Sequence, residues 1–105
     1  MTIESSREQE KLVLQVKGRL DTTTAPQLEA ALGASLADVR ELVLDFSALE
    51  YISSAGLRVL LATHKAMKKQ DGGMVVEGAN EEIYEVFTIT GFSEILNIKH
   101  GTGVA

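Results

Sequence analysis

The chain opens with a stretch in which hydrophobic and polar residues alternate. Within residues 11–17, Leu12, Leu14 and Val16 share one face and mostly polar residues fill the other. A period of two residues is typical of a strand with one face toward solvent. A weaker strand is expected over residues 3–7, so the sheet should begin with an antiparallel hairpin.

Three later segments carry apolar residues at helical spacing and predict helices. The first begins near Thr24, which can cap it, and Gln27 stands at the position of a capping-box partner. The second covers roughly residues 54–70. The third follows Asn80, a good capping residue, and Gly91 is placed to end it.

Short apolar runs separate these helices and predict further strands. Residues 41–46 form a buried strand, and residues 74–76 and 97–99 form two more, whereas residues 47–52 are interpreted as a turn. Strands that alternate with helices predict an α/β domain with a mixed, mainly parallel sheet. We expect four to five strands with helices packed against them, in one domain spanning residues 1–105.

Ser53 and Ser54 stand at the start of the second predicted helix. On a helical wheel of about 100° per residue, Ser54 lies near an outward row one turn before Arg58. On the same wheel Leu61 faces inward, and His64 lies on the apolar face, so we expect His64 to be a packed core residue. Two explanations of Ser54 stay open: it is a helix cap, or it is a serine presented for phosphorylation.

A phosphate on Ser54 would act more strongly on binding than on folding. A charge at a helix end contributes about 0.3–1 kcal/mol, and an exposed ion pair about 0.2–1 kcal/mol. A group of about −1.5 to −2 charges at a partner contact can cost several kcal/mol through like-charge repulsion. The physical chemistry therefore favours an interface switch. Gly56, two residues later, indicates either close backbone approach or a surface left bare for a partner.

Composition excludes several classes of function. There are no cysteines and only two histidines, so we expect no disulfide, no metal site and no cofactor. The net charge of −5 opposes nucleic-acid binding. No apolar run is long enough to cross a membrane, and the polar, acidic N-terminus does not resemble a signal peptide. These features predict a cytoplasmic protein, and its small polar surface fits a protein that is monomeric when free.

Four motifs stand out along the chain: Gly18-Arg19-Leu20-Asp21, the long segment from Leu44 to Leu57, the turn Asp71-Gly72-Gly73 and the Gly91-Phe92 step. Together they resemble the STAS domain, specifically the small single-domain anti-sigma factor antagonists of bacteria. The resemblance covers essentially the whole chain. Many members carry Asp immediately before the phosphorylated serine, where this chain has Ser53, and we expect Ser53 to cap the helix in place of that Asp.

The resemblance implies a mechanism of partner switching. The unmodified protein would bind an anti-sigma factor, a serine kinase with a histidine-kinase-like ATPase fold, and so release the sigma factor. Phosphorylation of Ser54, or alternatively of Ser53, would end binding, and a PP2C-type phosphatase would reset the switch. The residues expected at the partner surface are Asp21, Thr22, Ser53, Ser54, Gly56 and Arg58.

Two other functions are weighed against this one. STAS-like domains also serve as subunits of membrane transport complexes, and such members need no phosphorylation. An enzyme is the third possibility, but the sequence shows no convergent acid, base and nucleophile. A binding module without catalytic residues is therefore the leading hypothesis.

Overall fold

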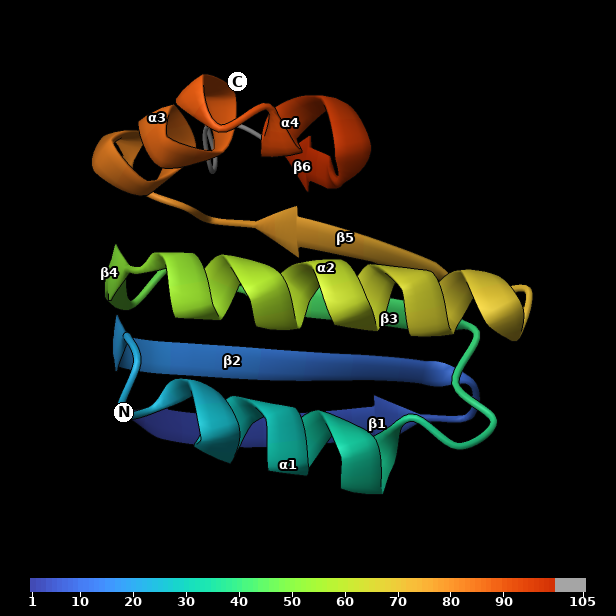
Figure 1. Ribbon diagram of the computed structural model, residues 1–105. Helices are drawn as coiled ribbons and strands as arrows, with labels where there is room; N and C mark the ends of the chain where they lie inside the picture. The colour runs from blue at the N-terminus through green and yellow to red at the C-terminus, as the bar shows by residue number, and fades with distance from the viewer. Residues whose placement is uncertain (100–105) are drawn as a thin grey trace.

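The hairpin predicted at the start of the chain is present, and it forms one edge of a mixed sheet. The computed structural model describes residues 1–99 (Figure 1). Its strands are β1 (Thr2–Glu8), β2 (Lys11–Leu20), β3 (Glu41–Asp45), β4 (Leu49–Ile52), β5 (Gly73–Glu77) and β6 (Asn97–Lys99). Its helices are α1 (Ala25–Ser35), α2 (Ser54–Lys69), α3 (Glu81–Ile89) and α4 (Phe92–Ile95).

The sheet has the order β1-β2-β3-β5-β6, and only the β1–β2 pair is antiparallel among the described strands. The register aligns Leu14, Leu44 and Val76 in one row across the three central strands, and all three are buried. Helices α1 and α2 lie side by side over the sheet, while α3 and α4 lie near β5 and β6 (Figure 1). The predicted α/β class is confirmed.

One strand lies where a turn was predicted. The segment interpreted as a turn contains β4, which pairs in parallel with the last residues of β2 through Leu49–Gly18 and Ile52–Leu20. The chain reaches β4 by a short turn in which the Asp45 carboxylate accepts a hydrogen bond from the Ser47 backbone N–H at 2.9 Å. Because four residues carry too little pattern to identify a strand, the prediction of four to five strands missed this sixth one.

The predicted cap of α1 does not form. The Thr24 residue is already helical, and its hydroxyl donates to the Arg19 carbonyl at 2.8 Å and accepts from the Asp21 N–H at 2.9 Å. The Thr24 side chain therefore stabilises the loop before α1 and does not cap the helix. By contrast, the Asn80 cap is confirmed, because its side chain accepts from the Ile83 N–H at 2.8 Å.

Helix α2 buries its inner face as predicted, with two corrections. Leu57, Leu60 and Met67 are buried. Leu61 is only half-buried, since it lies on the outer side of the helix between Arg58 and the later lysines. His64 is also half-buried and lines a surface groove, so it is not a core residue.

Candidate functional site

The loop after β2 and the start of α2 are held together by backbone contacts. Leu20 and Ile52 are paired residues of β2 and β4, and the Ser53 N–H donates to the Leu20 carbonyl at 2.9 Å. This arrangement places Asp21, the residue after Leu20, beside the N-terminal end of α2. Two segments about 30 residues apart in sequence therefore form one end of the domain.

The carboxylate of Asp21 organises its loop. One oxygen accepts from the backbone N–H groups of Thr23 at 3.0 Å and Thr24 at 3.1 Å, and the Arg19 guanidinium lies 3.8 Å from the other oxygen. The hydrogen bond from the Thr24 backbone is the main cause that lowers the pKa of Asp21 below its usual value. The carboxylate is therefore charged at neutral pH. Thr22, at the tip of the loop, is exposed.

The two serines occupy different environments. Ser54 is the first residue of α2 and is exposed. Ser53 is the residue before the helix and is half-buried, and its hydroxyl oxygen is fully buried without a hydrogen-bond partner. The expectation that the Ser53 side chain caps α2 is wrong, because that side chain accepts no hydrogen bond from the first turn.

This difference predicts that Ser53→Ala does not lower the stability. A buried hydroxyl without a partner keeps its desolvation cost and gains no hydrogen bond, so we expect its removal to leave the free energy of unfolding unchanged or to raise it by up to about 1 kcal/mol. The matched control is Asn80→Ala, which removes a formed cap and should cost about 1 kcal/mol. Chemical denaturation of both variants measures the difference, and an equal loss in both would contradict it.

Gly56 is a packing residue. It is buried, and a Cβ atom at this position would lie 2.7 Å from Leu20 Cγ and 2.9 Å from Ile52 Cγ1. Of the two explanations offered by the sequence, close backbone approach therefore holds. The glycine lets α2 sit directly against the paired ends of β2 and β4, which fixes the position of Ser54.

Arg58 and three lysines of α2 give the outer side of the helix a positive charge. Arg58, Lys65, Lys68 and Lys69 are all exposed, and α2 contains no acidic residue. Arg58 follows Ser54 by about one helical turn. A negative group on Ser54 would thus meet both the helix N-terminus and this guanidinium.

Two neighbouring residues of the site went unnoticed in the sequence. The guanidinium of Arg19 lies 4.3 Å from the centre of the Tyr51 ring, and Tyr51 is 40% exposed. The two face each other because they are paired across β2 and β4. Tyrosine and arginine are frequent in binding hot spots, so this pair extends the candidate surface. The signal was hidden because β4 was interpreted as a turn.

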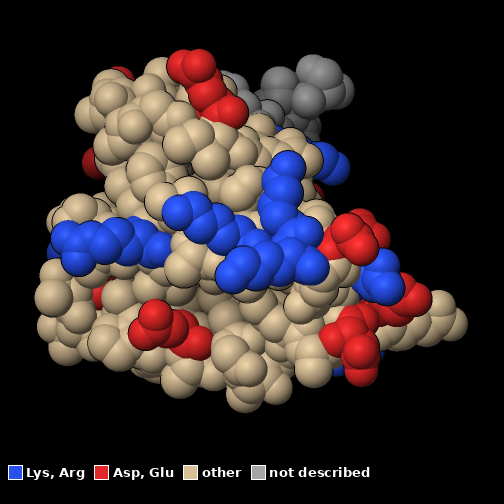
Figure 2. Space-filling view, turned by 45° about the vertical axis from the view of Figure 1, so that its right-hand side comes forward, with Lys and Arg blue, Asp and Glu red and all other residues tan. Residues whose placement is uncertain are grey.

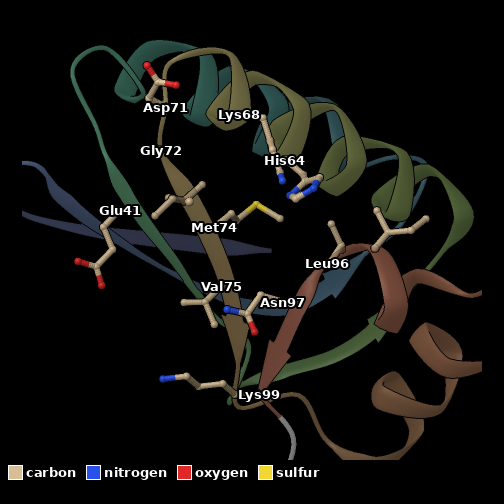
Figure 3. Close-up of a pocket in the computed structure, with 13 residues that line it drawn as sticks. Glu41, His64, Lys68, Asp71, Gly72, Met74, Val75, Leu96, Asn97 and Lys99 are labelled. Atoms are coloured by element: carbon tan, nitrogen blue, oxygen red, sulfur yellow. The ribbon is translucent and has the colours of Figure 1, made fainter.

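A separate groove of about 760 Å³ runs along the edge of β5. His64 and Lys68 reach into it from α2 toward Met74 and Leu96 (Figure 3). Among residues 1–99, no hydrogen bond or ion pair links its acidic and basic side chains to one another.

Within the described part of the chain, no group of three or more histidine, aspartate or glutamate side chains could hold a metal ion. None of the helices described is long and apolar enough to cross a membrane.

Comparisons with known proteins agree on one family. The family model of the STAS domain matches residues 2–105. A candidate anti-sigma factor antagonist of Bordetella bronchiseptica, BtrV, is 37% identical over 95 residues, which cover 90% of this chain and 82% of BtrV. The chain therefore belongs to the STAS domain family.

Solved structures give the same result. An anti-sigma factor antagonist from Mycobacterium paratuberculosis has a TM-score of 0.85 and 32% identity, covering 95% of this chain and 86% of that one. SpoIIAA of Bacillus, solved in its phosphorylated form, has a TM-score of 0.74 and 17% identity, covering 93% and 91% of the two chains. At that identity SpoIIAA supports the fold alone.

Proposed function

We propose that this protein is an anti-sigma factor antagonist that is switched by phosphorylation of Ser54. In the unmodified state it binds an anti-sigma factor, which releases the sigma factor, and the phosphorylated state does not bind. The observation that carries the proposal is the exposed Ser54 at the start of α2, beside the Asp21 loop. The relatives named as anti-sigma factor antagonists support it.

The anti-sigma factor is proposed to be the kinase as well. The family resemblance implies a serine kinase with a histidine-kinase-like ATPase fold and a PP2C-type phosphatase that removes the phosphate. Asp21, Thr22 and Arg58 would contact the kinase around Ser54, together with the Arg19–Tyr51 pair. Gly56 would act indirectly, because it is buried and sets the position of the helix.

Ser54 is proposed as the modified residue in preference to Ser53. A kinase must reach the hydroxyl oxygen, and the Ser53 oxygen is buried whereas Ser54 is exposed. The absence of Asp before Ser54 does not prevent formation of α2, which begins at Ser54 with the Leu57 N–H bonded to the Ser53 carbonyl at 3.0 Å.

We infer that the protein acts by binding and not by catalysis. The groove beside β5 holds no linked acid–base pair among the described residues, and the serine at the start of α2 has no adjacent histidine. His64 is ten residues from Ser54, about 15 Å along the helix.

The test is a phosphorylation assay with a native cell lysate and radiolabelled ATP, followed by mass spectrometry of the recovered protein. Wild type and Ser53→Ala are expected to incorporate one phosphate at Ser54, and Ser54→Ala is expected to incorporate none. Phosphate on Ser53 in the wild type would move the switch to that residue. No incorporation in any variant would contradict the phosphorylation switch.

A further inference from the structure

The outer side of α2 carries a concentrated positive charge on an acidic protein. We define the α2 basic stripe as Arg58, Lys65, Lys68 and Lys69, which are all exposed; Lys68 lies at the edge of the stripe, where it also lines the groove beside β5. Figure 2 shows lysine and arginine side chains in a band across the face over α2, with acidic side chains on both sides of it. The whole chain nevertheless has a net charge of −5.

The charges of the stripe are not used within the fold. Among residues 1–99, the ion pairs involve Lys11, Lys17 and Arg19 and none of the four stripe residues. The stripe also has no acidic neighbour on its own helix. Four unpaired positive charges spread over about 17 Å repel one another and are available to a partner.

The stripe is continuous with the phosphorylation site. Ser54 lies on the same side of α2 and about one turn before Arg58, so the stripe extends from the site along the outside of the helix. A partner seated on Ser54 and the Asp21 loop would therefore also cover the stripe. Leu61, half-buried between Arg58 and Lys65, adds an apolar contact to it.

We propose that the α2 basic stripe docks an acidic surface of the anti-sigma factor and accelerates its association. This inference rests on the proposed function and adds a charge mechanism to its switch. Complementary charges steer partners together and raise association rates at low salt. A phosphate of about −1.5 to −2 charges on Ser54 would cancel about half of the positive charge of the stripe. Phosphorylation would thus slow association as well as break the contact.

A protein partner fits the stripe better than a nucleic acid does. Nucleic-acid binding depends on many Lys and Arg contacts to a continuous polyanion, and acidic side chains lie on both sides of this short stripe (Figure 2). A compact acidic surface can match four charges without approaching those carboxylates. The overall negative charge also repels a long polyanion.

The experiment compares two variants that lose the same number of charges. Lys65→Gln with Lys69→Gln removes two charges from the stripe, and Lys11→Gln with Lys99→Gln removes two from exposed positions on β2 and β6, away from α2. Thermal unfolding first establishes that both variants are folded. Stopped-flow association with the purified anti-sigma factor from the same organism is then measured over a range of salt concentrations.

The stripe variant is expected to associate about 10-fold more slowly than wild type at low salt, with a weaker dependence on salt. The control variant should associate at nearly the wild-type rate. Equal rates in both variants would overturn the proposal. So would a stripe variant that keeps the wild-type rate with the anti-sigma factor but loses binding to duplex DNA or to anionic vesicles.

If the proposed function itself were wrong, the wild-type protein would not bind the anti-sigma factor, a result that differs from failure of the stripe proposal alone. In that case an NMR titration with a hepta-glutamate peptide tests whether the stripe binds an acidic partner. Chemical-shift changes at Arg58, Lys65 and Lys69 would support an acid-binding surface. Changes elsewhere, or none, would overturn it.

Discussion

The Ser54→Asp variant is expected to bind the anti-sigma factor about 100-fold more weakly than wild type and to keep its stability. The exposed side chain contacts little of the fold, so the free energy of unfolding should change by less than about 1 kcal/mol. A new charge inside an interface costs several kcal/mol, and about 1.4 kcal/mol corresponds to a tenfold change in affinity. Titration calorimetry and thermal unfolding measure the two quantities.

Two control variants test whether the loss of binding requires a negative charge and whether that charge must be at position 54. Ser54→Ala should bind as wild type does, because it removes the acceptor of the phosphate without adding charge. Ser6→Asp places the same charge on an exposed position of β1, outside the candidate site, and should also bind normally. If Ser54→Asp bound as tightly as these controls, the switch would be refuted and a transport-complex subunit would become the leading explanation.

The Gly56→Ala variant is expected to lose about 1–3 kcal/mol of stability. The added methyl group would lie within 3.0 Å of Leu20 and Ile52, which are 0% and 4% exposed and cannot move freely. Overpacking of this kind forces side chains out of their preferred rotamers or shifts the backbone. For a domain of this size we expect a decrease in melting temperature of about 4–8 °C per kcal/mol, measured by calorimetry.

Gly33→Ala is the matched control, because it makes the same change on a helix where nothing lies within 4 Å of the new Cβ. Alanine is better than glycine inside a helix by about 0.5–1 kcal/mol, so this variant should be more stable than wild type. The two substitutions therefore have opposite signs. A gain in stability for Gly56→Ala would contradict the close approach of α2 to β2 and β4.

Local pattern determined most of the elements and the position of the candidate serine. Alternation identified β2, and helical spacing placed α2 within one residue of its observed bounds. The Asn80 cap was also predicted, because a cap depends on residues three positions apart. Such features depend on residues that are close together along the chain, and the sequence gives the identities of these residues directly.

The tertiary structure alone decided which residues meet at the site. The pairing of β4 with β2 brings Tyr51 to Arg19 and the start of α2 to the Asp21 loop, and no local pattern records that pairing. Gly56 illustrates the same limit, since its small size matters only once Leu20 packs against it. The sequence predicted the elements other than β4 and the presence of a serine at the start of a helix. Contacts between distant segments decided that Ser54 is exposed while the Ser53 hydroxyl is buried, because burial depends on what the rest of the fold places alongside.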